Sequence, residues 1–119
     1  MDIKEEVAKR LAAYPLYSQE KTNSVQQHMV SAKLYNAFGA GTGYITEYRP
    51  ETGIAFGYVM GLDYDEWGYI SIDELLEVRH PAGLPAIRLD GEFAPRVFHE
   101  VLAAHVPHRA IEVVVFMAS

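Results

Sequence analysis

Residues 54–78 read IAFGYVMGLDYDEWGYISIDELLEV, and this stretch decides the fold. Over Ile54–Leu62, large side chains alternate with small ones. This two-residue period is typical of a strand with one packed face and one closely approached face. Glycine inside a strand often marks a bulge or a crossing neighbour, so Gly57 and Gly61 are expected to lie where another backbone passes.

An acidic run and a second strand follow in the same stretch. We expect a polar loop over Asp63–Glu66 and a strand over Trp67–Ile70. Ser71 and Glu74 have the spacing of a capping box, in which each side chain bonds the other residue's backbone N–H. We therefore expect a helix over Ile72–Val78 that ends before the next proline.

The flanking sequence extends this pattern into a sheet with helices. Tyr44–Tyr48 alternates like a strand, and Arg49–Gly53 joins it to the strand beginning at Ile54 as a hairpin. Apolar residues at helical spacing predict helices over Asp2–Tyr14 and Ala94–His105. Three further strand candidates are Val25–Asn36, Ile87–Leu89 and the apolar segment Ala110–Met117.

These elements predict one α+β domain over residues 1–119, since the chain is long enough for one core and too short for two. We expect a mostly antiparallel sheet of four to five strands, with the N-terminal and C-terminal helices packed on one face. If Ala110–Met117 formed an open edge strand, it would serve as a seam for a homodimer.

The composition narrows the classes of function. The chain has no cysteine, which excludes disulfides, thiol nucleophiles and zinc or iron–sulfur sites built on cysteine. A net charge of −6 argues against direct binding of duplex nucleic acid, which depends on Lys and Arg. No apolar run is long enough to span a membrane and the N-terminus is highly charged, so a cytoplasmic protein is expected.

The charge is unevenly distributed along the chain. From Ala55 to Val78 there are six acidic residues and no Lys or Arg. Such a run is commonly a solvated edge that aids solubility, and the alternative is a negative patch that binds a basic protein surface. For that alternative, aromatic residues serve as anchors. The predicted partner-binding residues are Asp63, Tyr64, Asp65, Glu66, Trp67, Asp73, Glu74 and Glu77.

An enzyme is the first alternative. Glu47, Asp65 and Glu66 would act as a clustered carboxylate site of a metal-dependent hydrolase or nuclease, provided that the fold brings them together. His99, His105 and His108 lie close in sequence, but His99 and His105 are six residues apart and fall on different helix faces. The sequence therefore predicts no catalytic residue, no metal site and no cofactor.

A single-stranded nucleic-acid binding module is the second alternative. Exposed aromatic side chains beside cations form stacking platforms for bases, and Lys33 and Arg49 are the only cations near the predicted aromatic strands. The aromatic residues in question are Tyr35, Tyr44, Tyr48, Tyr58, Tyr64, Trp67 and Tyr69.

Several short motifs carry a family resemblance. They are LYSQE at 16–20, YITEY at 44–48, FGYV at 56–59, GL at 61–62, WGYISIDEL at 67–75 and GLP at 83–85. In this order they resemble a family of small domains of unknown function. Members of that family occur on plasmids, phages and integrative elements near antirestriction and conjugation genes. The resemblance covers residues 16–93, and segment 94–117 has the character of an appended helix and strand.

The resemblance implies a context and no defined activity. It suggests a mobile-element accessory protein in a bacterial or phage-infected cytoplasm. Small acidic proteins of such elements often occupy a defence enzyme. The expected function is therefore non-enzymatic protein–protein contact, with a CRISPR or restriction complex as the partner and the acidic patch as the contact surface.

Overall fold

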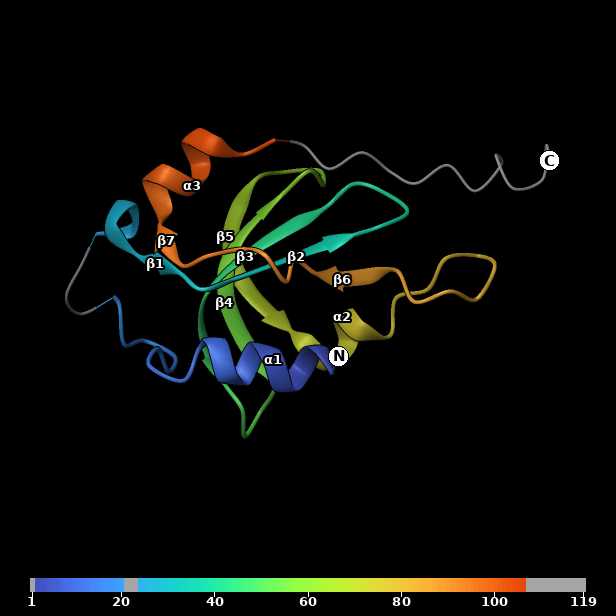
Figure 1. Ribbon diagram of the computed structural model, residues 1–119, viewed down its shortest axis with the longest axis horizontal. Helices are drawn as coiled ribbons and strands as arrows, with labels where there is room; N and C mark the ends of the chain where they lie inside the picture. The colour runs from blue at the N-terminus through green and yellow to red at the C-terminus, as the bar shows by residue number, and fades with distance from the viewer. Residues whose placement is uncertain (1, 21–23, 107–119) are drawn as a thin grey trace.

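The computed structural model describes residues 2–20 and 24–106, and its centre is a five-stranded antiparallel sheet with the order β5-β4-β3-β2-β6 (Figure 1). The expected α+β class is confirmed, and so is a sheet within the predicted number of strands. The strands of this sheet are β2 (Ala32–Asn36), β3 (Thr42–Arg49), β4 (Ile54–Met60), β5 (Glu66–Ser71) and β6 (Ile87–Leu89).

The hairpin of β3 and β4 forms the middle of the sheet, as the alternation predicts. Arg49 pairs with Ile54 across the turn, and Gly53 in that turn has a φ of 71°, which glycine adopts without strain. The register shifts between Ile45 and Glu47, which marks a β-bulge in β3. The pairing of β4 with β5 then runs without interruption from Ile54 to Val59.

Helix α1 (Ile3–Arg10) begins where Asp2 caps it by accepting the Glu5 N–H at 3.1 Å. The helix is shorter than predicted, because the chain turns after Leu11 instead of continuing to Pro15. Helix α2 (Ile72–Leu76) follows β5 directly. Ser71 caps α2 by accepting the Glu74 N–H at 3.3 Å, as the capping-box spacing predicts.

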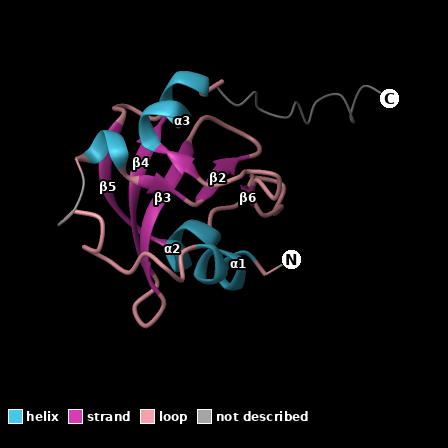
Figure 2. Ribbon diagram, turned by 60° about the vertical axis from the view of Figure 1, so that its left-hand side comes forward, coloured by secondary structure: helices cyan, strands magenta, loops and turns pink. Residues whose placement is uncertain are grey.

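Helices α1 and α3 (Phe98–Ala104) cover opposite faces of the sheet, whereas the sequence analysis placed the terminal helices on one face (Figures 1 and 2). Successive strand residues point to opposite faces. Ile45 packs with Val7 of α1, while its neighbour Tyr44 packs with Phe98 of α3. The helical spacing identified an apolar face in each helix, but spacing alone does not state which face of a sheet receives it.

A small second sheet positions α3. The predicted strand Val25–Asn36 divides into the 3₁₀ turn η1 (Val25–Gln27), β1 (Met29–Val30) and β2. β1 pairs with β7 (Arg96–Val97), and the Phe98 N–H donates to the His28 carbonyl at 2.7 Å. Helix α3 therefore begins at Phe98, later than the sequence predicts. The expected strand Ala110–Met117 lies outside the described residues.

None of the helices within the described residues has the length and apolar character needed to cross a bilayer.

Candidate functional site

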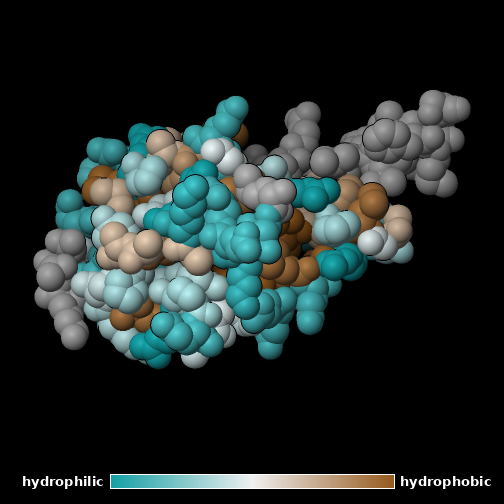
Figure 3. Space-filling view, turned by 60° about the horizontal axis from the view of Figure 1, so that its bottom comes forward, coloured by the Kyte–Doolittle hydropathy of each residue, from teal (hydrophilic) through white to brown (hydrophobic). Residues whose placement is uncertain are grey.

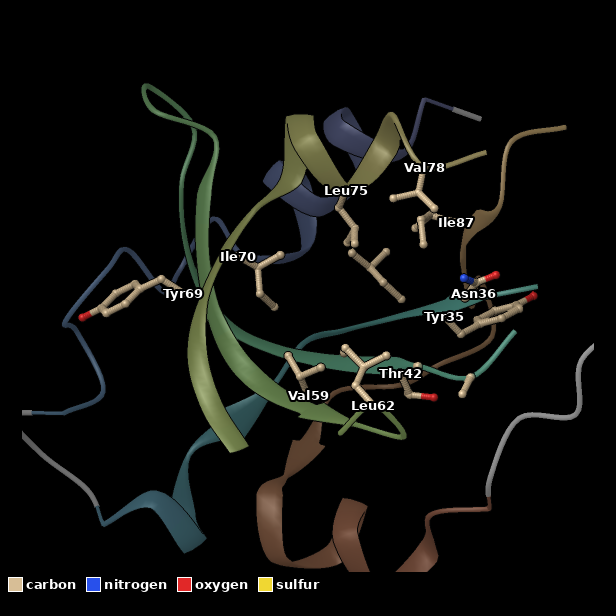
Figure 4. A pocket seen from close by; sticks show the side chains of 14 residues that line it. Tyr35, Asn36, Thr42, Val59, Leu62, Tyr69, Ile70, Leu75, Val78 and Ile87 are labelled. Atoms are coloured by element: carbon tan, nitrogen blue, oxygen red, sulfur yellow. The ribbon is translucent and has the colours of Figure 1, made fainter. Parts of the chain in front are cut away.

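The face of the sheet that carries α1 and α2 is only partly covered, and the uncovered part forms an apolar groove of about 360 Å³. No side chain that lines this groove is charged. In Figure 4, Leu75, Val78 and Ile87 point into the space from one side and Val59 and Leu62 from the other. The groove is defined here by Leu34, Gly43, Val59, Leu62, Ile70, Leu75, Val78 and Ile87.

Glycines on this face of the sheet contribute to the groove. Gly43 pairs with Leu34 on one side and with Val59 on the other. A Cβ added at Gly43 would lie 3.8 Å from its nearest neighbour, the Cδ1 atom of Ile70. A Cβ added at Gly68 on β5 would meet no atom within 4 Å. Gly57 differs, because a Cβ there would lie 2.2 Å from the Tyr44 carbonyl oxygen. Packing therefore demands glycine at position 57 but not at 43 or 68.

Acidic residues border the groove where β4 turns into β5. A second hollow of about 340 Å³ adjoins the groove, shares Val59 and Leu62 with it, and is also lined by Asp63, Tyr64 and Glu66. The face shown in Figure 3 carries apolar side chains in a depression surrounded by hydrophilic ones. The site combines an apolar floor with negative charge at its margin.

The six acids predicted as a patch fall into two groups at opposite ends of β5. Asp63, Asp65 and Glu66 lie at its start, and the acids of α2 follow its end. At a rise of about 3.3 Å per residue, the strand separates the two groups by roughly 17 Å. The α2 group consists of Asp73, Glu74 and Glu77.

Two of these acids are engaged within the chain. Asp65 accepts the Gly61 N–H at 3.0 Å, which fixes the β4–β5 turn. Asp73 forms an ion pair with Lys4 at 2.8 Å, and its hydrogen bond raises the pKa of Lys4. Asp63, Glu66, Glu74 and Glu77 make no ion pair with any residue that the structure describes.

The two predicted aromatic anchors have different environments. Tyr64 is 77% exposed and lines the hollow beside the groove. Trp67 is half-buried on the opposite face, where it stacks on Phe56 with ring centroids 5.5 Å apart. Its ring centroid also lies 4.6 Å from that of Phe98 on α3. Trp67 therefore stabilises the packing of α3, while Tyr64 is available to a partner.

The carboxylates of the predicted hydrolase site do not converge. Glu47 is fully buried and accepts backbone N–H groups from Tyr17 at 2.8 Å and Gln19 at 2.9 Å. The pairing of Glu47 with Phe56 and of Glu66 with Val59 puts these two acids on opposite faces of the sheet. Within residues 2–20 and 24–106, no three His, Asp or Glu side chains are grouped for metal binding.

The histidines near the C-terminus also lie apart. His99 is exposed, and His108 lies outside the described residues. His105 packs edge-on against Tyr44, with 2.6 Å between its Nδ1 and the Tyr44 hydroxyl. Burial lowers the pKa of His105, and the charge of Lys33 lowers it further, whereas Asp65 opposes the shift. This histidine anchors the end of α3 to the sheet.

The aromatic residues and cations considered for base stacking have different environments. Tyr44 and Tyr48 are buried, and Lys33 lies 5.8 Å from the centroid of the Tyr44 ring. Arg49 is at the turn end of β3, next to Ile54. Among the described residues the exposed aromatic rings are those of Tyr17, Tyr64 and Tyr69. Tyr64 and Tyr69 lie beside or in β5, where the sequence contains acids and no cation.

Sequence reasoning missed the groove itself. Its signals were Gly43 and Gly68, two strand positions where packing does not require glycine, and the exposed Leu62 in an otherwise polar loop. Neither signal shows which face of the sheet stays uncovered, because that depends on how far α1 and α2 extend over it.

Comparison with known proteins identifies a family to which the chain is similar. The profile of a family described as a protein of unknown function (DUF2958) matches residues 3–107, which include both α1 and α3 and extend beyond the region 16–93 of the resemblance. Neither the curated proteins nor the solved structures compared with the chain gave a match. Because the match spans most of its length, the chain belongs to the DUF2958 family of small uncharacterised domains.

Proposed function

We propose that this protein is a non-enzymatic binding module that captures a basic protein surface through the groove and its acidic margin. The observation that carries the proposal is an uncovered groove of about 360 Å³ without a charged lining residue, bordered by exposed acids. An apolar floor supplies affinity by burial of side chains. A charged margin selects a partner of opposite sign and accelerates the encounter.

The chemistry of the margin defines the partner. Asp63 and Glu66 are exposed and form no ion pair among the described residues, so a Lys or Arg of a partner can reach them without displacing an internal cation. Between Ala55 and Val78 the sequence itself supplies no Lys or Arg to offset this negative charge. A nucleic-acid-binding surface of another protein has the opposite charge and fits this description.

The biological setting is proposed from the motifs that the chain shares with small domains of mobile elements. In that setting the protein is an accessory protein of a plasmid, phage or integrative element in the bacterial cytoplasm. Its partner is then a host defence complex of the CRISPR or restriction type. Occupation of the basic channel of such a complex would exclude nucleic acid from it.

The test uses two variants with equal net charge. In Asp63→Lys/Glu66→Lys the margin is reversed, and in Glu51→Lys/Glu92→Lys two exposed acids elsewhere are reversed; each variant changes the net charge from −6 by +4 to −2. Asp65 stays unchanged because its hydrogen bond to Gly61 holds the turn. A third variant, Leu62→Ser, removes an exposed apolar wall of the groove.

The measurement is capture of proteins from host lysate on immobilised wild type and variants, followed by binding assays with the purified captured protein. We expect the control variant to bind the captured protein like the wild type. The margin variant and Leu62→Ser should lose at least about tenfold in affinity. Equal binding of the captured protein by all four forms would refute the proposal.

A further inference from the structure

Strand β5 leaves one edge of the main sheet open. It pairs only with β4 among the described strands and lies at the end of the strand order. Proteins usually protect such an edge with Lys, Pro or a bulge, because its free N–H and C=O groups can pair with another chain. The sequence of β5, EWGYIS, contains no Lys or Pro, and its pairing shows no register shift.

No contact within the described residues explains why β5 has a glycine at position 68. Alternation places it on the groove face together with Glu66 and Ile70. Its backbone does not require glycine, since its φ lies outside the left-handed region, and an added Cβ would meet no atom within 4 Å. Glycine weakens a strand and is typical of a place where a ligand or another backbone approaches closely. On the groove face, no described residue lies where a Cβ of residue 68 would point, so this space is open to a molecule from outside.

We propose that β5 accepts an extended segment of the partner protein as an additional strand, whose groove-facing side carries both apolar and basic side chains. This inference rests on the proposed function and states how the partner is bound. The main chain of the segment pairs with the open edge of β5. Its apolar side chains pack over Gly68 toward Val59 and Leu62, and a Lys or Arg faces Glu66 across the new strand pair.

An extended segment fits this surface better than a helix or a second copy. A helix satisfies its own backbone groups and would leave the edge of β5 unpaired. In an antiparallel pair of β5 strands from two copies, Asp63, Asp65 and Glu66 of one copy would lie at the end of β5 that leads into the acidic helix α2 of the other, without a Lys or Arg from residues 55–78 to offset them. A basic, apolar strand from another protein removes both conflicts.

The experiment uses a synthetic nonapeptide, labelled with fluorescein, whose odd positions alternate between Val and Lys and whose even positions are Thr, so that Val and Lys lie on the same face of the strand. Two analogues carry the same side chains but are N-methylated at all odd or at all even positions, which removes the N–H donors of one edge. Fluorescence anisotropy measures binding to the wild type, to Gly68→Ala and to Gly43→Ala. The amide spectrum of ¹⁵N-labelled protein shows which residues the probe contacts.

We expect at least one N-methylated analogue to bind the wild type about tenfold more weakly than the unmodified peptide does. The Gly68→Ala variant should likewise bind the unmodified peptide about tenfold more weakly than the wild type does. Amide signals of Glu66–Ser71 should shift, whereas those of Ile3–Arg10 on α1 should stay in place. Gly68→Ala keeps its fold by circular dichroism, because the added methyl has open space. Gly43→Ala narrows the groove without touching the edge, so it should weaken binding less than Gly68→Ala.

Two outcomes would overturn strand addition. In one, both N-methylated analogues bind like the parent and the β5 amides do not shift; if Asp63→Lys/Glu66→Lys still abolishes that binding, the proposed function survives and only its mode is wrong. In the other, the parent peptide does not bind at all. The proposed function itself fails only if the captured protein binds the margin variant and Leu62→Ser as it binds the wild type.

Discussion

At the scale of single residues, Glu47 shows how this fold uses a buried carboxylate. It lies on the bulged strand β3 and accepts the backbone N–H groups of Tyr17 and Gln19. Tyr17 has a φ of 70°, a left-handed conformation that is costly for a residue with a Cβ. The two hydrogen bonds hold the segment after α1 in this conformation. Glu47 is thus a structural residue, although its carboxyl chemistry first marked it as a catalytic candidate.

The first prediction concerns this carboxylate. Glu47→Gln replaces one acceptor oxygen with an NH₂ group and leaves a buried N–H without its partner. We expect a loss of about 1–3 kcal/mol in the free energy of unfolding. Urea denaturation measures it, with the exposed Glu51→Gln as the matched control, expected within about 0.5 kcal/mol of the wild type. An unchanged urea midpoint for Glu47→Gln would contradict this role.

The second prediction concerns His105. Burial lowers the pKa of His105 in the folded chain below its ordinary value of about 6.5. The unfolded chain therefore binds the proton first as the pH falls. Stability contributed by neutral His105 is present above about pH 6.5 and declines as the pH falls from there toward the folded pKa.

The measurement compares urea midpoints at about pH 7.5 and about pH 5.5 for the wild type and for His105→Asn, which cannot titrate in this range. The wild type should lose more stability between the two values than the variant does. Equal losses in the two proteins would show that His105 does not contribute to the pH dependence.

At the scale of elements, two paired glycines of neighbouring strands differ in whether packing requires glycine. Gly57 of β4 and Gly68 of β5 are paired residues on the same face. A Cβ at Gly57 would lie 2.2 Å from the Tyr44 carbonyl oxygen, whereas one at Gly68 has open space. The two positions therefore form a natural pair of test and control within one strand pair.

The third prediction follows from this pair. Gly57→Ala should destabilise the protein by about 1–3 kcal/mol or more, because the backbone of β3 must move to admit the methyl group. Gly68→Ala should leave stability unchanged or raise it by up to about 1 kcal/mol, because alanine has less freedom in the unfolded chain. Urea denaturation of both variants decides the matter, and a similar loss in both would contradict the packing described for Gly68.

The sequence predicts elements well where their signal is local. The β3–β4 hairpin, the cap of α2 by Ser71 and the strand Ile87–Leu89 are confirmed, because alternation, turn glycines and capping residues act over a few neighbours. The start of α3 was wrong because β7 pairs with β1, about 67 residues earlier in the chain. Such a pairing leaves no local trace.

At the scale of the whole molecule, the two helices on opposite faces leave one part of the sheet uncovered. α1 and α2 cover the part of their face next to Ala55 and Ile72, and the groove occupies the remainder near Val59. The opposite face is filled by aromatic rings that pack with Phe98. The groove is therefore open because α1 and α2 cover only part of their face of the sheet.

The candidate site could be predicted from the sequence only in part. The acidic run was visible, and the structure brings Asp63 and Glu66 to the margin of the groove. The division of the acids by β5, the inward position of Trp67 and the ion pair of Asp73 depend on strand length, strand face and helix docking. These are properties of the tertiary structure, and a run of like charges does not encode them.

The most direct test of the groove as a partner site is photo-crosslinking in host cells from two exposed leucines. Benzoylphenylalanine replaces Leu62 at the groove in one protein, and Leu102 on α3 at the opposite face in the other. The account predicts a crosslinked partner from position 62 that disappears when Glu66→Lys is added, and none of that partner from position 102. The same crosslinks from both positions, or a crosslink at 62 that Glu66→Lys leaves unchanged, would contradict it.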